Sequence, residues 1–227
     1  MLTTFFVVAT MVVSSTATHA DVTVKVETDA AWQAFMGVSE ADRTGALPAQ
    51  GAFVFDGAWG VADTTAVFDG PGNTLTLGPN TIGDPDPFWY IGGGAPGALG
   101  NKWMDANTFV QVDDTFAGMN VTFEGEVLSN SLTANHTATV FIRDFAPDFS
   151  SFTESTAALT PGAFSISLMT DAGAGRHVQY GFNMQGENVW ITDVGGFGNV
   201  VLVSIPEPGS IAFIGLGAMG LLLRRRR

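Results

Sequence analysis

The sequence predicts an all-β protein, an antiparallel β-sandwich with a jelly-roll-like succession of short strands. Between Asp21 and Ser204 the chain is rich in Gly, Thr, Val, Phe, Asp and Asn, and poor in Lys, Glu and Leu. This composition favours strands and tight turns over helices. Short runs alternate apolar with polar residues, which is the period of a strand with one packed face. Turns containing Gly, Pro, Asp or Asn separate the runs, as in sandwiches and jelly rolls.

The first 20 residues are predicted to form a secretory signal peptide. An apolar stretch runs from Phe5 to Val13, and the small and polar residues that follow end in Thr-His-Ala at Ala20. This is a small-x-small cleavage site before Asp21. No Lys or Arg precedes the apolar stretch. A buried first strand is the alternative, but the Ser-Ser-Thr-Ala-Thr run suits a cleavage region better than a core.

One short helix is expected near the start of the body. Asp29 can cap its first turn, and Trp32, Phe35 and Met36 fall at positions i, i+3 and i+4 of one helical face. The glycines between residues 37 and 45 should end it.

Strands are expected through the rest of the body, wherever apolar residues occupy every second position. In the run 177–184, one face would hold the apolar side chains and the other the polar ones, His177, Gln179 and Asn183. The other runs are 52–55, 74–77, 121–128, 137–145, 164–168 and 200–203.

The charge of the chain limits its partners. The formal net charge is −13, from 9 basic and 22 acidic residues. Without the four arginines at the C-terminus, 5 basic residues face 22 acidic ones, a net −17. Such a surface repels nucleic acid and anionic lipid, so no nucleic-acid partner is expected. The absence of cysteine excludes disulfides and cysteine-based metal sites.

The C-terminal tail combines three features. Pro206 and Pro208 hold Glu207 in an extended segment, because proline suits neither a helix interior nor a central strand. The 14 residues Ser210–Leu223 are apolar or small, and as a helix they span about 21 Å, short of a hydrocarbon core of about 30 Å. The arginines that follow would stay cytoplasmic, leaving the body outside. The tail is therefore predicted to be a marginal anchor in the inner membrane.

This order and spacing resemble the PEP-CTERM sorting signal of Gram-negative bacteria. The resemblance implies that an exosortase, a membrane protease-transpeptidase, removes the tail and releases the body or transfers it to the envelope, typically in bacteria that make exopolysaccharide. An ordinary tail anchor is the alternative. The residues that match the signal are Pro206, Glu207, Pro208 and Gly209, with Arg224, Arg225, Arg226 and Arg227.

The body also resembles jelly-roll domains of the galactose-binding or carbohydrate-binding type, in its strand pattern and its length. An aromatic, glycine-rich segment at 84–104 fits that resemblance. Flat aromatic faces attract the polarised C–H groups of sugars, and glycine lets a ligand approach the backbone. The alternative is that these aromatic residues belong to the core. The candidate ligand-binding residues are Trp89, Tyr90 and Trp103, with Trp190 in a later polar stretch.

Clustered aspartates suggest structural calcium, because hard oxygen donors in loops suit that ion. Asp and Asn also favour turns without any metal, and no Asp-x-Asp-x-Asp-Gly loop is present. The candidate ligands are Asp84, Asp86, Asp113 and Asp114, with Asp63, Asp69 and Asn73 as further turn donors.

Support for an enzyme is weaker. Glu124 and Glu126 share one face of a predicted strand, about 7 Å apart, and paired carboxylates can hydrolyse glycosides. Two exposed glutamates more often form a solvated face. After signal removal only His136 and His177 remain, and neither Gly-x-Ser-x-Gly nor His-Glu-x-x-His occurs.

The sequence thus predicts three segments: a signal peptide at 1–20, a β-sandwich at 21–203, and a sorting signal with a short apolar helix at 204–227. The expected function is that of an exported, non-enzymatic envelope or matrix protein that is sorted by an exosortase and binds exopolysaccharide. The alternative is a secreted glycan-active hydrolase that uses Glu124 or Glu126.

Overall fold

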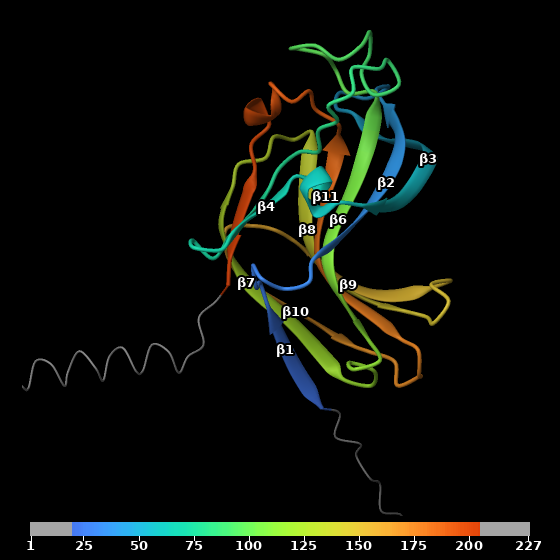
Figure 1. Cartoon of the computed structure of the whole chain (residues 1–227), viewed down its shortest axis with the longest axis vertical. Helices are drawn as coiled ribbons and strands as arrows, with labels where there is room; N and C mark the ends of the chain where they lie inside the picture. The colour runs from blue at the N-terminus through green and yellow to red at the C-terminus, as the bar shows by residue number, and fades with distance from the viewer. Residues whose placement is uncertain (1–19, 205–227) are drawn as a thin grey trace, which may run out of the picture.

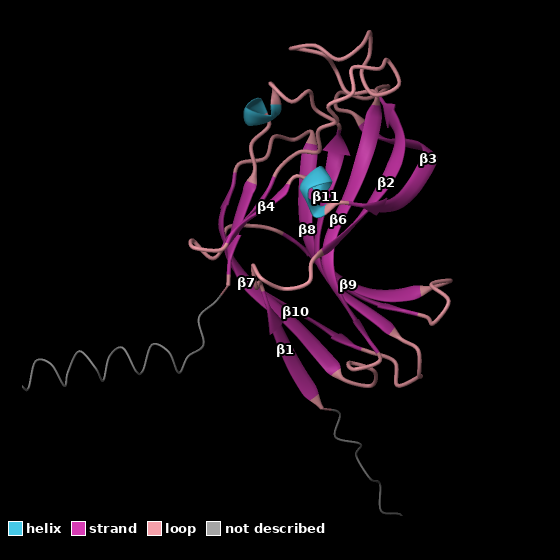
Figure 2. Ribbon diagram, viewed as in Figure 1, coloured by secondary structure: helices cyan, strands magenta, loops and turns pink. Residues whose placement is uncertain are grey.

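Twelve strands in two six-stranded sheets make up the computed structural model, which describes residues 20–204 (Figure 1). Two single-turn 3₁₀ helices, η1 (Val61–Thr64) and η2 (Val194–Gly196), are the helical elements of this part of the chain. The two sheets confirm the predicted all-β class, and Figure 2 shows how strands dominate the body.

Sheet A forms around the long strand β7. The short strand β1 runs parallel to β7 at residues 120–124, and β12 runs antiparallel to it at residues 126–130, so the two share one edge end to end. Strand β10 takes the other edge. The parallel pairing of β1 departs from the purely antiparallel prediction. The strands are β1 (Asp21–Lys25), β4 (Ala66–Asp69), β5 (Thr74–Leu77), β7 (Asn120–Asn130), β10 (Gly162–Met169) and β12 (Val200–Val203).

Sheet B is antiparallel throughout, in the order β3-β2-β6-β11-β8-β9. In Figure 1 the edge strand β3 and the yellow β8–β9 hairpin both project to the right of the body, so the sheet is strongly bent. The strands are β2 (Gln33–Asp42), β3 (Ala49–Trp59), β6 (Lys102–Asp113), β8 (His136–Phe145), β9 (Phe152–Ala158) and β11 (His177–Glu187).

The core lies between the inner faces of the two sheets. Phe123 of β7 is fully buried at its centre, with ring centroids 5.5, 5.2 and 5.4 Å from those of Phe164, Tyr180 and Phe182. These aromatic contacts join sheet A to sheet B, because Tyr180 and Phe182 belong to β11. In a chain without cysteine, this apolar burial takes the place of a covalent framework.

The predicted N-terminal helix is wrong. Residues 33–42 form β2, paired with β3 on one side and β6 on the other. Ala34, Met36 and Val38 alternate into the core, whereas Phe35 points outward and is partly exposed. Residues four positions apart, such as Trp32 and Met36, lie on one face of a helix and also on one face of a strand. Hydrogen bonding to two neighbouring strands makes this segment a strand.

The predicted ends of the chain lie outside the described residues. These are the signal peptide at 1–20, except its last residue, the C-terminal apolar helix, and the eight residues of the sorting signal. Between residues 20 and 204, no helix is long and apolar enough to cross a membrane.

Truncating the central aromatic residue tests this account of the core. We expect Phe123→Ala to lower the free energy of unfolding by about 3–5 kcal/mol, because it removes a buried ring and leaves a cavity. Phe53→Ala is the matched control, since the Phe53 side chain is 66% exposed and should cost little. Denaturant unfolding of both variants makes the measurement, and equal losses would contradict the assignment of the core.

Candidate functional site

The outer face of sheet B carries a groove of about 580 Å³, the sheet B groove. Its lining residues come from β2, β3, β6, β8, β9 and β11 and the β8–β9 turn, so it crosses the whole sheet. Five aromatic rings line it, those of Phe35, Phe109, Phe145, Phe149 and Phe152. The polar side chains that line it are Gln33, Asp56, Asn107, Gln111, Arg143 and Gln179.

Strand register brings the polar side chains of the groove together. Asn107 of β6 stands opposite Asn183 of β11, and Gln111 stands opposite Gln179. In the next pairing Gln179 stands opposite Arg143 of β8. Since all five occupy outward positions of their strands, they form rows across the middle of sheet B.

These side chains hold one another in place. The Arg143 guanidinium donates through Nη1 to Asn107 Oδ1 at 2.7 Å and through Nε to Glu154 Oε2 at 2.6 Å. Asn183 Nδ2 donates to the same Asn107 oxygen at 3.0 Å and also to the carboxylate of Asp105. The floor of the groove is therefore a fixed lattice of amides around one arginine, rather than a set of mobile side chains.

Aromatic rings close one end of the groove. The Phe145 ring centroid lies 5.0 Å from that of Phe152 and 5.5 Å from that of Phe149. The Arg143 guanidinium lies 4.0 Å from the centroid of the Phe141 ring, a cation–π contact that helps to hold the arginine in place. Phe149 and Phe152 are about half exposed, so their faces remain accessible to a ligand.

The charge in and around the groove is mainly negative. Arg143 is the basic residue of the lining, and the Glu154 carboxylate already pairs with it. Asp56 lines the groove, and Asp105 lies in the adjoining amide lattice. A neutral ligand with many hydroxyl groups suits this surface, because a negatively charged one would meet uncompensated carboxylates.

The aromatic residues predicted from the glycine-rich segment do not form one platform. Tyr90 is fully buried, and its hydroxyl donates to Ile82 O at 2.7 Å and accepts from Ile82 N at 3.1 Å. Trp190 packs edge-on against Tyr90 with ring centroids 5.2 Å apart. Trp89 packs against Phe88 and the core, and Trp103 lies on β6 with its indole nitrogen buried. These contacts favour the alternative that the aromatic residues serve the core, and ligand binding by them stays a prediction.

The predicted calcium ligands lie in two separate places, at opposite ends of β6. Asp84 Oδ1 accepts from Asp86 N at 3.0 Å, and Asp86 Oδ1 accepts from Phe88 N at 2.7 Å, so both stabilise turns. Asp113 and Asp114 follow at the far end of the strand. The described part of the chain holds no group of three or more His, Asp or Glu side chains arranged for a metal ion. Structural calcium stays a prediction.

The two glutamates considered for glycoside hydrolysis lie on the other sheet. Glu124 and Glu126 occupy outward positions of β7 in sheet A, as the alternation predicted. Glu124 Oε1 lies 3.8 Å from Lys25 Nζ. Neither glutamate lines the sheet B groove.

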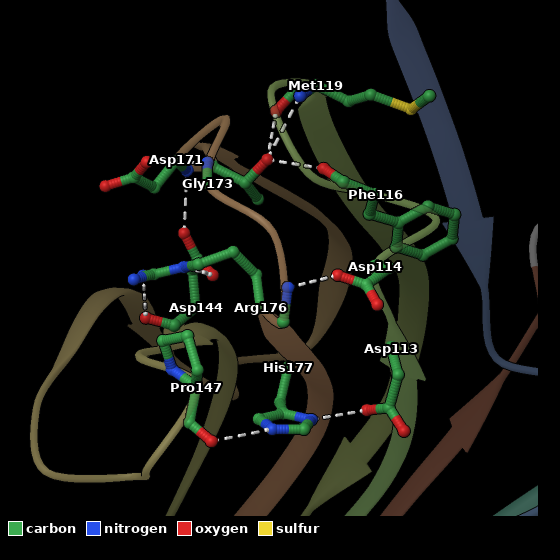
Figure 3. A network of polar contacts seen from close by, with 12 residues as sticks. Asp113, Asp114, Phe116, Met119, Asp144, Pro147, Asp171, Gly173, Arg176 and His177 are labelled. Carbon is green, nitrogen blue, oxygen red and sulfur yellow. Dashed lines mark hydrogen bonds and ion pairs between the residues drawn. The ribbon is translucent and has the colours of Figure 1, made fainter.

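A polar network around Asp144, Arg176 and His177 secures one end of sheet B (Figure 3). Asp144 is fully buried on the inner side of β8, and its carboxylate accepts from Arg176 Nε at 2.9 Å and from Asp171 N at 2.7 Å. The hydrogen bond from Arg176 to Asp144 raises the pKa of the guanidinium. This buried ion pair ties the turn between β10 and β11 to β8.

On the outer side of the same end, His177 joins Asp113. His177 Nδ1 lies 2.7 Å from Asp113 Oδ1, and the imidazole stacks on Phe149 with centroids 4.2 Å apart. The hydrogen bond raises the pKa of His177 and lowers the pKa of the Asp113 carboxyl. The stabilisation from His177 is therefore complete below its ordinary pKa and is lost as the pH rises through the raised value. That from Asp113 is present above its ordinary pKa and is lost as the pH falls through the lowered value.

Comparison with known proteins gives one match, at the C-terminal end. Residues 204–227 match the model of the PEP-CTERM protein-sorting motif. No curated protein and no solved structure matches the chain. The PEP-CTERM motif implies an exported protein whose membrane-anchored precursor is sorted by an exosortase, as the sequence predicted.

The sequence predicts an outward face for Gln179 and Asn183, but it does not predict the groove. Its lining residues come from strands that are far apart in the sequence, such as Phe35 on β2, Asn107 on β6 and Arg143 on β8. The available signal was the alternation of each strand, which gives the face but not the neighbouring strand.

Removing the cation from the buried pair tests the network of Figure 3. We expect Arg176→Met to lower the free energy of unfolding by about 3–5 kcal/mol, because Asp144 would remain buried without a counter-charge. The double variant Asp144→Asn/Arg176→Met should recover part of that loss in urea unfolding. A single variant as stable as the unaltered protein would show that the pair does not hold this end of the sheet.

Proposed function

We propose that this protein is a non-enzymatic component of the cell envelope or extracellular matrix that binds exopolysaccharide in the sheet B groove. The observation that carries the proposal is the groove itself, an aromatic and amide surface on a protein with a PEP-CTERM motif. The body would pass through an inner-membrane precursor with its C-terminus in the cytoplasm. The exosortase would then release it to the envelope or the medium.

The chemistry of the groove favours a neutral polysaccharide. Sugar rings present C–H faces that pack on Phe35, Phe149 and Phe152, and hydroxyl groups that pair with amides such as Gln111 and Gln179. Because the amides are already held by one another, binding would restrict few further side chains. The adjacent carboxylates disfavour an acidic polymer.

The position of the groove also agrees with the sorting route. The last strand, β12, belongs to sheet A, and the PEP-CTERM motif begins at the residue that follows it. The groove lies on the outer face of sheet B, on the other side of the core. A polymer in the groove and a sorting enzyme at the tail would therefore contact different sheets.

Glycan binding by the groove is tested at its two ends. We expect Phe35→Ala and Phe152→Ala each to weaken binding of a neutral polysaccharide about three- to tenfold, since each removes one aromatic contact. Both side chains are partly exposed, so the fold should tolerate the change. A glycan array, with and without calcium, selects the polysaccharide, and affinity electrophoresis measures the loss.

Leu128→Ala is the control for that experiment, because Leu128 lies on the outer face of sheet A and is about as exposed as Phe152. It should leave binding unchanged. A protein that retains no polysaccharide, or a control variant that loses as much affinity as the groove variants, would contradict the proposal.

Processing at the tail is tested at the acidic residue of the motif. We expect Glu207→Ala to leave the precursor in the membrane fraction, because the prolines on either side present Glu207 to a membrane enzyme. Glu126→Ala, an exposed glutamate of the body, should be processed normally. Precursor and mature sizes are compared in membrane and medium, in a host with the exosortase and a host without it. Equal processing in both hosts would point to an ordinary tail anchor.

A further inference from the structure

A second hollow adjoins the sheet B groove at the edge of the sheet. It has a volume of about 510 Å³ and is lined by residues 58–60 of β3 and the following turn, by Asp63 of η1, and by residues 81–83. Ala58 lines both hollows, so they approach each other at this residue of the edge strand β3. We call this second hollow the edge hollow.

The edge hollow has the features of a sugar subsite. The half-buried Trp59 supplies an aromatic wall and Ile82 an apolar one. The carboxylate of Asp63 can accept hydrogen bonds from ligand hydroxyl groups, although Gly60 N already donates to it at 3.2 Å. No side chain stands in the way at Gly83, where an added Cβ would meet nothing within 4 Å. A ligand can therefore approach the backbone closely there.

Thr81 gives an independent observation, a buried hydroxyl group beside this hollow that no described residue pairs with. Its hydroxyl oxygen is buried and has no hydrogen-bond partner among residues 20–204, although Thr81 lines the hollow. A buried hydroxyl without a partner costs free energy. Since no hydrogen bond holds it, rotation about χ1 can turn it into the hollow, where a ligand hydroxyl would satisfy it.

The charge of the edge hollow selects the same kind of ligand as the groove. Asp63 is its charged lining residue, so an anionic group would be repelled and hydroxyl groups would be accepted. A short oligosaccharide would occupy one hollow alone. Because the hollows meet at Ala58, a ligand long enough to occupy both would gain affinity from the second one.

We propose that the edge hollow is an additional subsite of the sheet B groove, and that the ligand is the interior of a neutral polysaccharide chain that passes over Ala58. This inference rests on the proposed function, because it takes the sheet B groove to be a glycan-binding site. It adds the class of ligand, a polysaccharide chain bound along its length. It also adds the residues that contact the part of the polysaccharide beyond the groove, which are Trp59, Asp63 and Thr81.

The length of the oligosaccharide is the variable that tests the proposal. The full chain, in a mild detergent, is titrated with ladders of neutral gluco-, manno- and galacto-oligosaccharides, from the disaccharide upward. We expect affinity to rise in two stages, the second stage beginning when the oligosaccharide becomes longer than the sheet B groove.

Two variants separate the edge hollow from the groove. Ala58→Leu should block the passage without offering a stacking face, and Ala52→Leu, exposed on the same strand outside both hollows, is its control. Thr81→Val removes the unpaired hydroxyl, so thermal stability should be unchanged or higher. Thr81→Val should weaken the longest oligosaccharides about three- to tenfold and leave the shortest unaffected. Ala58→Leu, at the junction of the two hollows, should weaken the longest oligosaccharides more than the shortest. Phe152→Ala should weaken every length.

The outcomes distinguish this inference from the function on which it rests. Affinity that stops rising once the groove is filled, with Thr81→Val unchanged at all lengths and Ala58→Leu affecting all lengths alike, would overturn the subsite and leave the groove intact. Absence of binding to every polysaccharide and oligosaccharide would overturn the glycan-binding function, and the subsite with it.

Discussion

Strand alternation in sheet B links the core of this protein to its groove. Successive side chains of a strand point to opposite faces, so the burial of Tyr180 and Phe182 on β11 fixes Gln179 and Asn183 on the outer face. The same constraint acts on β6 and β8, which pair with β11 on either side. A slip of one residue would exchange the two faces entirely. The burial that sets the register of the core therefore also decides which side chains line the groove.

Mutual contacts make the floor of the groove rigid. Arg143 is held by Asn107, Glu154 and the ring of Phe141, and Gln179 donates to Gln111 at 2.8 Å. Side chains that are already ordered lose little rotamer entropy when a ligand arrives. Hydroxyl groups of a ligand can use the lone pairs and N–H groups that these bonds leave over. A surface of this kind binds through many weak, simultaneous contacts.

Much of the fold followed from the sequence, and most of the candidate site did not. Alternation located the β11 run and assigned its two faces, because that information is local. The spacing from Trp32 to Met36 wrongly predicted a helix, because a separation of four residues fits a helix and a strand alike. The groove joins residues as distant as Phe35 and Gln179, and only strand order brings them together. The composition of the aromatic segment at 84–104 suggested a binding surface. Tyr90 is instead buried, with its hydroxyl hydrogen-bonded to Ile82, and local sequence does not reveal this burial.

The place of β12 inside sheet A has a mechanical consequence. Its four residues are hydrogen-bonded to β5 on one side and to β7 on the other, so the strand next to the sorting motif is not an edge strand. Tension applied through Val203 along the strand would have to shear two ladders at once, whereas an edge strand can be peeled away one bond at a time. A body tethered through this strand could carry load between its attachment and a polymer on the far sheet without unravelling from its end.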